Sequence, residues 1–171
     1  MPATRRPLQP LPLAATVLTG TVALYMALVA FGNITDFGTN QAFVQHVLAM
    51  DTTFKDPDLM WRSIESPTLQ NIAYVLIIVW ETVAAVLLIG GTVLWAREVR
   101  GGAGYAGPRR LSTIGLLMVL LLFGAGFMAV GGEWFAMWQS KSWNGLDAAA
   151  RNVVLAGVAL VVVQLRGADE R

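Results

Sequence analysis

The chain has 171 residues, of which 56% are hydrophobic and only 13% are charged. Soluble globular domains carry about 25% charged residues, so this composition indicates a membrane protein. The net charge of +1 provides no field that would attract nucleic acid, and we expect none as a partner. The chain has no cysteine, which excludes disulfides, thiolate metal ligands and a cysteine nucleophile.

Four apolar runs are long enough to cross a bilayer, which takes about 20 mostly apolar residues. They cover approximately residues 11–31, 69–96, 111–132 and 147–165. Each run is expected to be helical, because in lipid the backbone must pair its polar groups within its own segment. The first run is too long for a cleaved signal peptide and no clear A-x-A site follows it, so we expect it to be retained. The sequence therefore predicts an all-α fold, a four-helix transmembrane bundle, as a single domain over residues 11–166.

The basic residues predict how this bundle is oriented. Eight arginines fall in the tail 1–10, in the link 97–110 or at the C-terminal end: Arg5, Arg6, Arg97, Arg100, Arg109, Arg110, Arg166 and Arg171. The connections on the opposite side hold only Lys55, Arg62 and Lys141. The positive-inside rule places the side with more basic residues in the cytoplasm. We therefore expect the tails 1–10 and 167–171 and the link 97–110 to be cytoplasmic, in a bacterial inner membrane.

The two connections on the other side, residues 32–66 and 133–146, are predicted to pack together as a lid on the membrane surface. Thr39 can cap a short amphipathic helix over residues 40–50. Its apolar stripe comprises Phe43, Val44, Val47 and Leu48. Asp56 followed by Pro57 predicts the start of a second short helix, and Ser66 followed by Pro67 predicts the start of the second span.

Aromatic and small polar residues complete the predicted lid. Trp134, Trp138 and Trp143 suit the headgroup level of a membrane, where one end of the ring is wet. Asn33 and Asp36 are assigned to turn and cap positions, because short polar side chains hydrogen-bond their own backbone.

Three stretches carry a resemblance to a known family: "GNITDFGTNQAFVQHVLAMDTTF", "VWETV" and "WFAMWQSKSWNGLDAAARN". Together they resemble a bacterial family of predicted small integral membrane proteins of unknown function, over about residues 20 to 165. The resemblance implies four spans and supplies no mechanism. The N-terminal tail and the glycine-rich link match no part of that pattern.

Glu81 is the most informative single residue, because it interrupts the second apolar run. Counting from Ile72 at about 1.5 Å per residue places it roughly 14 Å deep in a hydrocarbon core of about 30 Å. A charged residue there is costly and must face protein or water. It is therefore a candidate for proton carrying or ligand binding. The alternative is a protonated glutamic acid hydrogen-bonded across helices, for instance to a backbone carbonyl or to Tyr74.

Glu133 and Arg151 are predicted to form an ion pair that fixes the third and fourth spans in register. Glu133 comes at the end of the third run, and Arg151 lies four residues after Asp147 in the fourth. Asn152 could extend that network. Such charges usually form structural pairs, although an arginine this shallow can also extend its side chain to the surface.

His46 is the only histidine in the chain. It could be a ligand or a pH-sensitive group, but a haem in a bundle usually takes two axial ligands and a zinc site takes three or four. We therefore favour an ordinary interfacial histidine. No metal and no cofactor is predicted, although Glu81 is compatible with a quinone or another lipid-like ligand.

The sequence is compatible with three functions. The first is a non-catalytic accessory or scaffold subunit of an inner-membrane complex, which we favour because the chain lacks familiar catalytic motifs. The second is a small carrier or redox-linked protein that uses Glu81 for protons or for a hydrophobic ligand. The third is a sensor whose lid binds a ligand. The expected partners are the lipid bilayer and other membrane proteins or a second copy.

Overall fold

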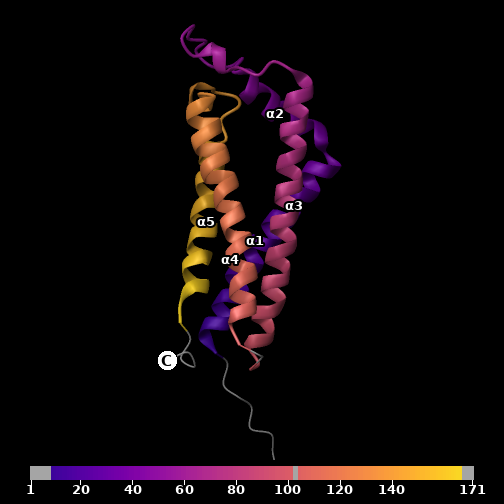
Figure 1. Cartoon of the computed structure of the whole chain (residues 1–171), viewed down its shortest axis with the longest axis vertical. Coiled ribbons are helices and arrows are strands. Elements are labelled where there is room, and N and C mark those ends of the chain that lie inside the picture. The colour runs from indigo at the N-terminus through magenta and orange to yellow at the C-terminus, as the bar shows by residue number, and fades with distance from the viewer. Residues whose placement is uncertain (1–8, 102–103, 167–171) are drawn as a thin grey trace, which may run out of the picture.

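Four long helical segments run side by side in the computed structural model, which describes residues 9–101 and 104–166 (Figure 1). They are α1 (Pro10–Thr35), α3 (Pro67–Glu98), α4 (Ala106–Leu120) continued by η2 (Leu121–Trp134), and α5 (Leu146–Gln164). Between them lie the short helix α2 (Phe37–Ala49) and the single turns η1 (Met60–Arg62) and η3 (Met137–Gln139). Residues 1–8 of the predicted N-terminal tail and the predicted C-terminal tail 167–171, with Arg5, Arg6 and Arg171, lie outside the described residues.

Each of the four long segments is long and apolar enough to cross a membrane. The third of them is the continuous segment from Ala106 to Trp134, formed by α4 and η2 together. The predicted all-α fold is thereby confirmed, with four long apolar helices packed together and a short helix between the first two. Ser66 begins α3 as expected, because its side chain accepts a hydrogen bond from Leu69 N and Pro67 occupies the first turn.

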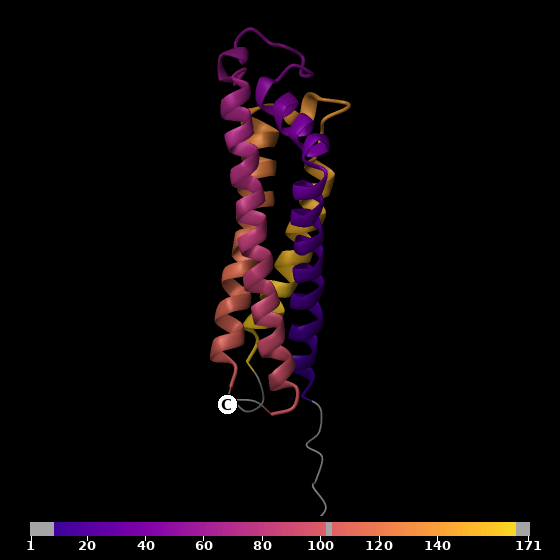
Figure 2. The same cartoon turned by 90° about the vertical axis from the view of Figure 1, so that its right-hand side faces the viewer.

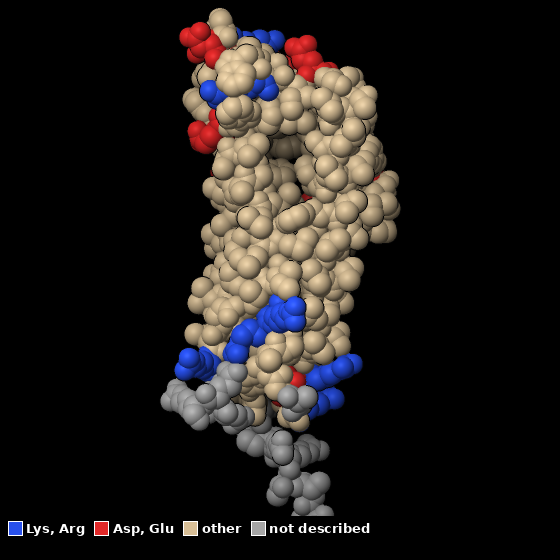
Figure 3. Space-filling model, viewed as in Figure 1, with Lys and Arg blue, Asp and Glu red and all other residues tan. Residues whose placement is uncertain are grey.

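The basic end of the bundle and the lid end are separated by a broad band without surface charge (Figure 3). The basic end holds the described arginines of the link and of the C-terminal end: Arg97, Arg100, Arg109, Arg110 and Arg166. Arg109 secures this end, since its Nε donates to Val163 O at 2.9 Å and its Nη2 to Leu165 O at 2.8 Å. A cation at the end of α5 also complements the helix dipole.

Close approach of α3 and α4 at the basic end depends on two glycines. A Cβ at Gly91 would lie 2.5 Å from Ser112 Oγ, and one at Gly115 would lie 2.7 Å from Leu88 Cγ. Ser112 also accepts a 3.1 Å hydrogen bond from Trp95 Nε1. Small residues at such positions let helix backbones approach in a membrane, where dispersion contacts replace the hydrophobic effect as the force holding helices together.

The second half of the third span is a π-helix, in which each backbone N–H bonds five residues back. Phe135 N, for example, donates to Val130 O at 3.0 Å. Segment η2 begins directly after Leu120, and four glycines lie in or at the end of this stretch: Gly124, Gly126, Gly131 and Gly132. π-Helical turns are rare, and they occur frequently at functional sites. A π-helical turn also contains more residues than an α-helical turn. The direction of the side chains in η2 therefore cannot be predicted by assuming 3.6 residues per turn.

The lid differs from its prediction in two respects. Residues 32–35 continue α1, and α2 begins at Phe37. Asp36 alone separates the two helices. The helix expected after Asp56 is reduced to a turn, in which Asp58 N donates to Asp56 Oδ1, and to the single turn η1. Ile64 N instead donates to Leu48 O at 2.8 Å, which ties this stretch to the end of α2.

The two lid segments contact each other. Thr52 Oγ1 and Ser140 Oγ lie 2.8 Å apart, and Phe54 N donates to Gln139 Oε1 at 2.9 Å. Beneath them, Met50, Phe135 and Ala136 form a small buried apolar cluster. Helix α2 crosses from the end of α1 toward α3 under this cover (Figure 2). The space below α2, between the diverging ends of the long helices, is where the candidate site lies.

Candidate functional site

A short chain of hydrogen bonds joins three helices around Glu81. Asn33 Nδ2 donates to Glu81 Oε2 at 2.7 Å, and Asn40 Nδ2 donates to Asn33 Oδ1 at 2.6 Å. Tyr74 Oη donates to the carbonyl of Asn33 at 3.4 Å. Glu81 is only 2% exposed and Tyr74 only 1% exposed. Polar groups buried this deeply require partners, and the three helices supply them to one another.

The break between α1 and α2 creates this arrangement. Asn33 lies in the last turn of α1 and Asn40 in the second turn of α2, and the bend at Asp36 lets the two amides meet. Thr39 Oγ1 donates to Asp36 Oδ2 at 2.8 Å, which stabilises the bend. Helix α2 is then held on α3 because Gln41 Nε2 donates to Asn71 Oδ1 at 2.8 Å.

A cavity of about 280 Å³, which we call the polar cavity, lies beside this chain of hydrogen bonds. Its polar lining comprises Asn33, Asn40, Glu81 and Asn152, together with the tyrosines Tyr25 and Tyr74. Asn152 comes from the second turn of α5, is 7% exposed, and makes no side-chain hydrogen bond with residues 9–101 or 104–166. The other carboxyl oxygen of Glu81, Oε1, likewise accepts no hydrogen bond from these residues. Two polar groups are thus available to a molecule in the cavity.

The remaining lining of the polar cavity is mainly aromatic and small. Aromatic rings enter from four segments: Tyr25, Phe43, Tyr74, Phe123 and Phe127. Gly145, which precedes α5, permits this arrangement, because a Cβ there would lie 2.9 Å from Phe43 Cζ. The cavity therefore combines one carboxyl group and several amides with aromatic walls.

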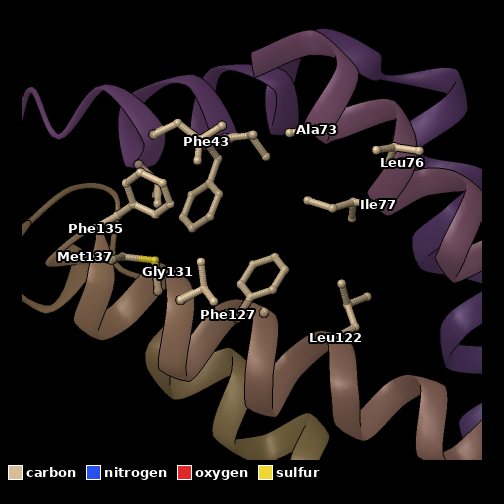
Figure 4. A pocket seen from close by; sticks show the side chains of 14 residues that line it. Phe43, Ala73, Leu76, Ile77, Leu122, Phe127, Gly131, Phe135 and Met137 are labelled. Atoms are coloured by element: carbon tan, nitrogen blue, oxygen red, sulfur yellow. The ribbon is translucent and has the colours of Figure 1, made fainter. Parts of the chain in front are cut away.

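A second hollow adjoins the first and is wholly apolar. This apolar pocket has a volume of about 340 Å³ and lies between α2, α3 and η2 (Figure 4). Phe43 and Ile77 point into it from one side, and Phe127 and Leu122 from the other. The two hollows share the side chains of Phe43, Val44, Ile77 and Phe127. Volumes of this size are at the lower end of small-molecule sites, which hold roughly 300–1,000 Å³.

The apolar pocket lies where α3 and the third span separate. Trp80 Nε1 donates to Met118 O at 2.9 Å, near the point where α4 becomes η2. Below that bond α3 packs along α4, whereas beyond it α3 makes few contacts with η2 (Figure 1). The space-filling surface is hollowed in the same region, just below the lid (Figure 3). The opening is set in the apolar band of the surface.

Several predicted site residues lie elsewhere than expected. Glu133 and Arg151 form no ion pair, since the one salt bridge among the described residues joins His46 and Asp51. Both side chains are exposed, and Glu133 borders a surface depression together with Arg62. Asn152 lines the polar cavity and makes no hydrogen bond with Glu133 or Arg151.

His46 belongs to the lid surface. Its Nδ1 lies 2.7 Å from Asp51 Oδ2, and its ring stacks on Trp143 with 4.5 Å between ring centroids. No group of three or more metal-ligating side chains occurs in the described part of the chain. Trp134 packs on Trp61 with centroids 5.5 Å apart, and Arg62 lies 4.8 Å from the centroid of Trp134. Trp138 is half-exposed and contacts Phe54 edge-on.

Asn33, Asn40 and Phe43 belong to the site, although their place in the sequence predicts them to be part of the lid. The expected partner of Glu81 was a carbonyl or Tyr74, whereas the observed partner is the amide of Asn33. A signal for Asn33 was present in the helical spacing of buried positions in α1. Met26, Ala30 and Asn33 continue the buried stripe at intervals of four and three residues. Nothing in the sequence comparably marks Phe127 or Asn152 as neighbours of Glu81.

The fold and its apolar surface define a small multi-pass integral membrane protein with four spans and a polar cavity between them. The chain belongs to the family described as "Predicted small integral membrane protein (DUF2165)", which matches residues 11–166. The family's description carries no activity. Neither the curated proteins nor the solved structures include a significant match to this chain.

Proposed function

We propose that this protein binds a hydrophobic small molecule inside the membrane, with the polar part of the ligand beside Glu81 and its apolar part in the apolar pocket. The observation that carries the proposal is the junction of the two hollows. Within the described part of the chain, a carboxyl group without a cationic partner borders one of them, and apolar side chains alone line the other. This proposal corresponds to the carrier hypothesis raised by the sequence.

Packing efficiency supports the proposal as well. Protein interiors are close-packed, and voids larger than a water molecule are few. A bundle built only for structure would gain stability by closing the space around Phe43, Phe127 and Ile77. The separation of α3 from η2 instead keeps that space open toward the apolar band of the surface. A ligand dissolved in the bilayer could then enter sideways without crossing the lid.

The accessory-subunit hypothesis rests on a less specific observation. Residues on α1 such as Leu24, Leu28 and Phe31 are each more than 60% exposed and would suit a partner helix. Lipid tails account for these exposed side chains equally well. The sensor hypothesis is supported only by the aromatic lid. The cavities therefore favour ligand binding over both alternatives.

The experiment compares two leucines introduced in place of glycine. Gly126 lines the apolar pocket, and a Cβ there would meet only ordinary contacts, the nearest at 3.8 Å. Gly157 in α5 lines neither hollow and has nothing within 4 Å of its Cβ position, so Gly157→Leu is the matched control. Each protein is purified from host membranes in mild detergent, and bound small molecules are extracted with organic solvent and quantified by mass spectrometry.

We expect the wild type and Gly157→Leu to carry one amphiphile at close to one molecule per chain, and Gly126→Leu to lose most of it. The proposal fails if all three proteins carry the same mixture of bulk lipids in the same amounts. A stoichiometric protein partner without a bound small molecule would instead support the accessory-subunit hypothesis.

A further inference from the structure

The charge balance of the polar cavity indicates what kind of ligand it accepts. Among the residues of ranges 9–101 and 104–166, Glu81 is the only charged one that lines it, and no Lys, Arg or His of these ranges does. Among the residues that the structure describes, no cation lies within 4 Å of the Glu81 carboxyl group. Burying a charge without a partner is unfavourable, so an anionic headgroup placed here would have no counter-ion. A cation would have one.

We propose that the ligand is a lipophilic amine, in which a protonated amino group lies beside Glu81 and a hydrocarbon chain lies in the apolar pocket. The proposal rests on the proposed binding function and specifies the chemical class of the ligand. A second observation supports the amine independently of charge. It concerns which atoms in the cavity are available to donate or accept hydrogen bonds.

The available polar atoms around the cavity are suited to a donor. Asn33 Nδ2 already donates to Glu81 Oε2, which leaves Oε1 as an acceptor. Asn152 is more than nine-tenths buried and lines the cavity without a side-chain partner in the described ranges, so its amide oxygen is a second acceptor, beside an amide nitrogen that can donate. An ammonium group has donors and no acceptor, and it can satisfy both oxygens.

The walls of the cavity suit the same group. Five aromatic rings line it, and aromatic faces attract cations through their quadrupoles. A quinone presents only carbonyl acceptors, so it would leave Glu81 Oε1 without a donor, and the carboxylate of a fatty acid would lie beside Glu81 without a cation. Of the two hydroxyls in the lining, that of Tyr74 is directed to the carbonyl of Asn33, and that of Tyr25 makes no hydrogen bond with the described residues. The cavity therefore offers a better match to an amine than to these lipids.

The test uses three probes that share a dodecyl chain: dodecylammonium, dodecanol and dodecanoate, each radiolabelled. Binding is measured at pH 7 on the full chain in nanodiscs of zwitterionic lipid, so that the membrane itself carries no net charge. The variants are Glu81→Gln and, as the matched control, Glu133→Gln, which changes an exposed glutamate at the lid end.

A cysteine-protection assay locates the bound probe. The chain has no cysteine, so a single introduced thiol reports one position. Ala148 lines the polar cavity and is exposed, and Ser142 is exposed in the lid outside that lining. A bound probe should slow maleimide labelling of Ala148→Cys and leave the labelling of Ser142→Cys unchanged.

We expect dodecylammonium to bind the wild type and Glu133→Gln about tenfold or more tighter than dodecanol, with dodecanoate weakest. Glu81→Gln should remove most of the preference for the amine and leave dodecanol binding within about twofold, since the neutral probe uses the same apolar pocket. Protection of Ala148→Cys should follow the same order.

The outcomes separate the two proposals. If dodecanol or dodecanoate binds as tightly as the amine, or if Glu81→Gln leaves the preference unchanged, the amine assignment is wrong and the binding function remains. If none of the three probes binds or protects Ala148→Cys, both the amine assignment and the proposed function are overturned.

Discussion

Asn33 Nδ2 donates a 2.7 Å hydrogen bond to Glu81 Oε2, which joins the last turn of α1 to the middle of α3. The bond engages one oxygen of the carboxyl group and leaves the other without a hydrogen bond from the described residues, in a side chain that lines the polar cavity. Asn33 is itself held by Asn40 of α2. The site therefore depends on the bend between α1 and α2 as much as on the span that carries Glu81.

The Asn33–Glu81 contact should be measurable as a coupling free energy. Interhelical hydrogen bonds in membrane proteins contribute about 0.6 kcal/mol on average and up to about 1.7 kcal/mol. We expect Asn33→Ala and Glu81→Ala, each of which removes one partner of the hydrogen bond, to lower the free energy of unfolding. The double variant should lose less than the sum of the two single losses, by an amount in that range. The free energy of unfolding of the wild type, both single variants and the double variant is measured by denaturant titration in mixed micelles.

A control cycle pairs Asn33→Ala with Glu133→Gln, whose side chains make no contact that the structure records. Those two changes should be additive within about 0.5 kcal/mol. Additivity in both cycles would show that the Asn33–Glu81 hydrogen bond does not contribute to stability.

Hydropathy is sufficient to predict the fold, because each membrane span requires a continuous run of apolar residues that can be recognised directly in the sequence. The four spans, the start of α3 at Ser66 and the apolar stripe of α2 follow from residue type and spacing alone. The sequence predicts the end of α1 near residue 31, whereas the helix continues through the polar residues Asn33 and Thr35. A polar residue at a helix end gives no sequence signal that separates the last turn from a loop.

The neighbours of Glu81 were less predictable because they depend on how each helix is rotated. Glu133, Arg151 and Asn152 all lie near the lid end of their spans, which is why the sequence predicts a network among them. Depth does not define which way a side chain points, and the glycines of η2 do not by themselves predict its π-helical turns. Cavities are a property of the packed bundle, so the junction of the two hollows could be found only in three dimensions.

Gly91 should be intolerant of a side chain because of the close contact between α3 and α4. A methyl group there would meet Ser112 Oγ at 2.5 Å and the backbone nitrogen of Ser112 at 3.1 Å, so the helices must separate. We expect Gly91→Ala to lower the free energy of unfolding by about 1–3 kcal/mol. Gly157→Ala, which adds the same methyl group in open space, should be neutral or stabilising by up to about 1 kcal/mol. Equal stability of the two variants would contradict this packing.

Trp143 should hold α2 over the polar cavity. Its ring stacks on His46 at 4.5 Å and contacts Phe43 edge-on at 6.2 Å. Each aromatic pair contributes about 0.5–1.5 kcal/mol, so Trp143→Leu should speed hydrogen exchange in residues 37–49 roughly two- to tenfold. Trp134→Leu is the contrast, because Trp134 packs on Trp61 and should affect residues 60–62 instead. Unchanged exchange of α2 in Trp143→Leu would show that the stacking does not hold this helix.

The orientation of the bundle is the remaining prediction, and the absence of native cysteine makes it directly measurable. The excess of arginine at the basic end leads us to propose that this end is cytoplasmic in a bacterial inner membrane and that the lid faces outward. Single cysteines at exposed positions report each end: Ser142→Cys in the lid and Ala106→Cys at the start of α4. A membrane-impermeant maleimide should label Ser142→Cys on intact spheroplasts and Ala106→Cys only after lysis. The reverse pattern would place Glu81 and its cavity nearer the cytoplasmic face, so that a water-soluble competitor would have to act from inside the cell.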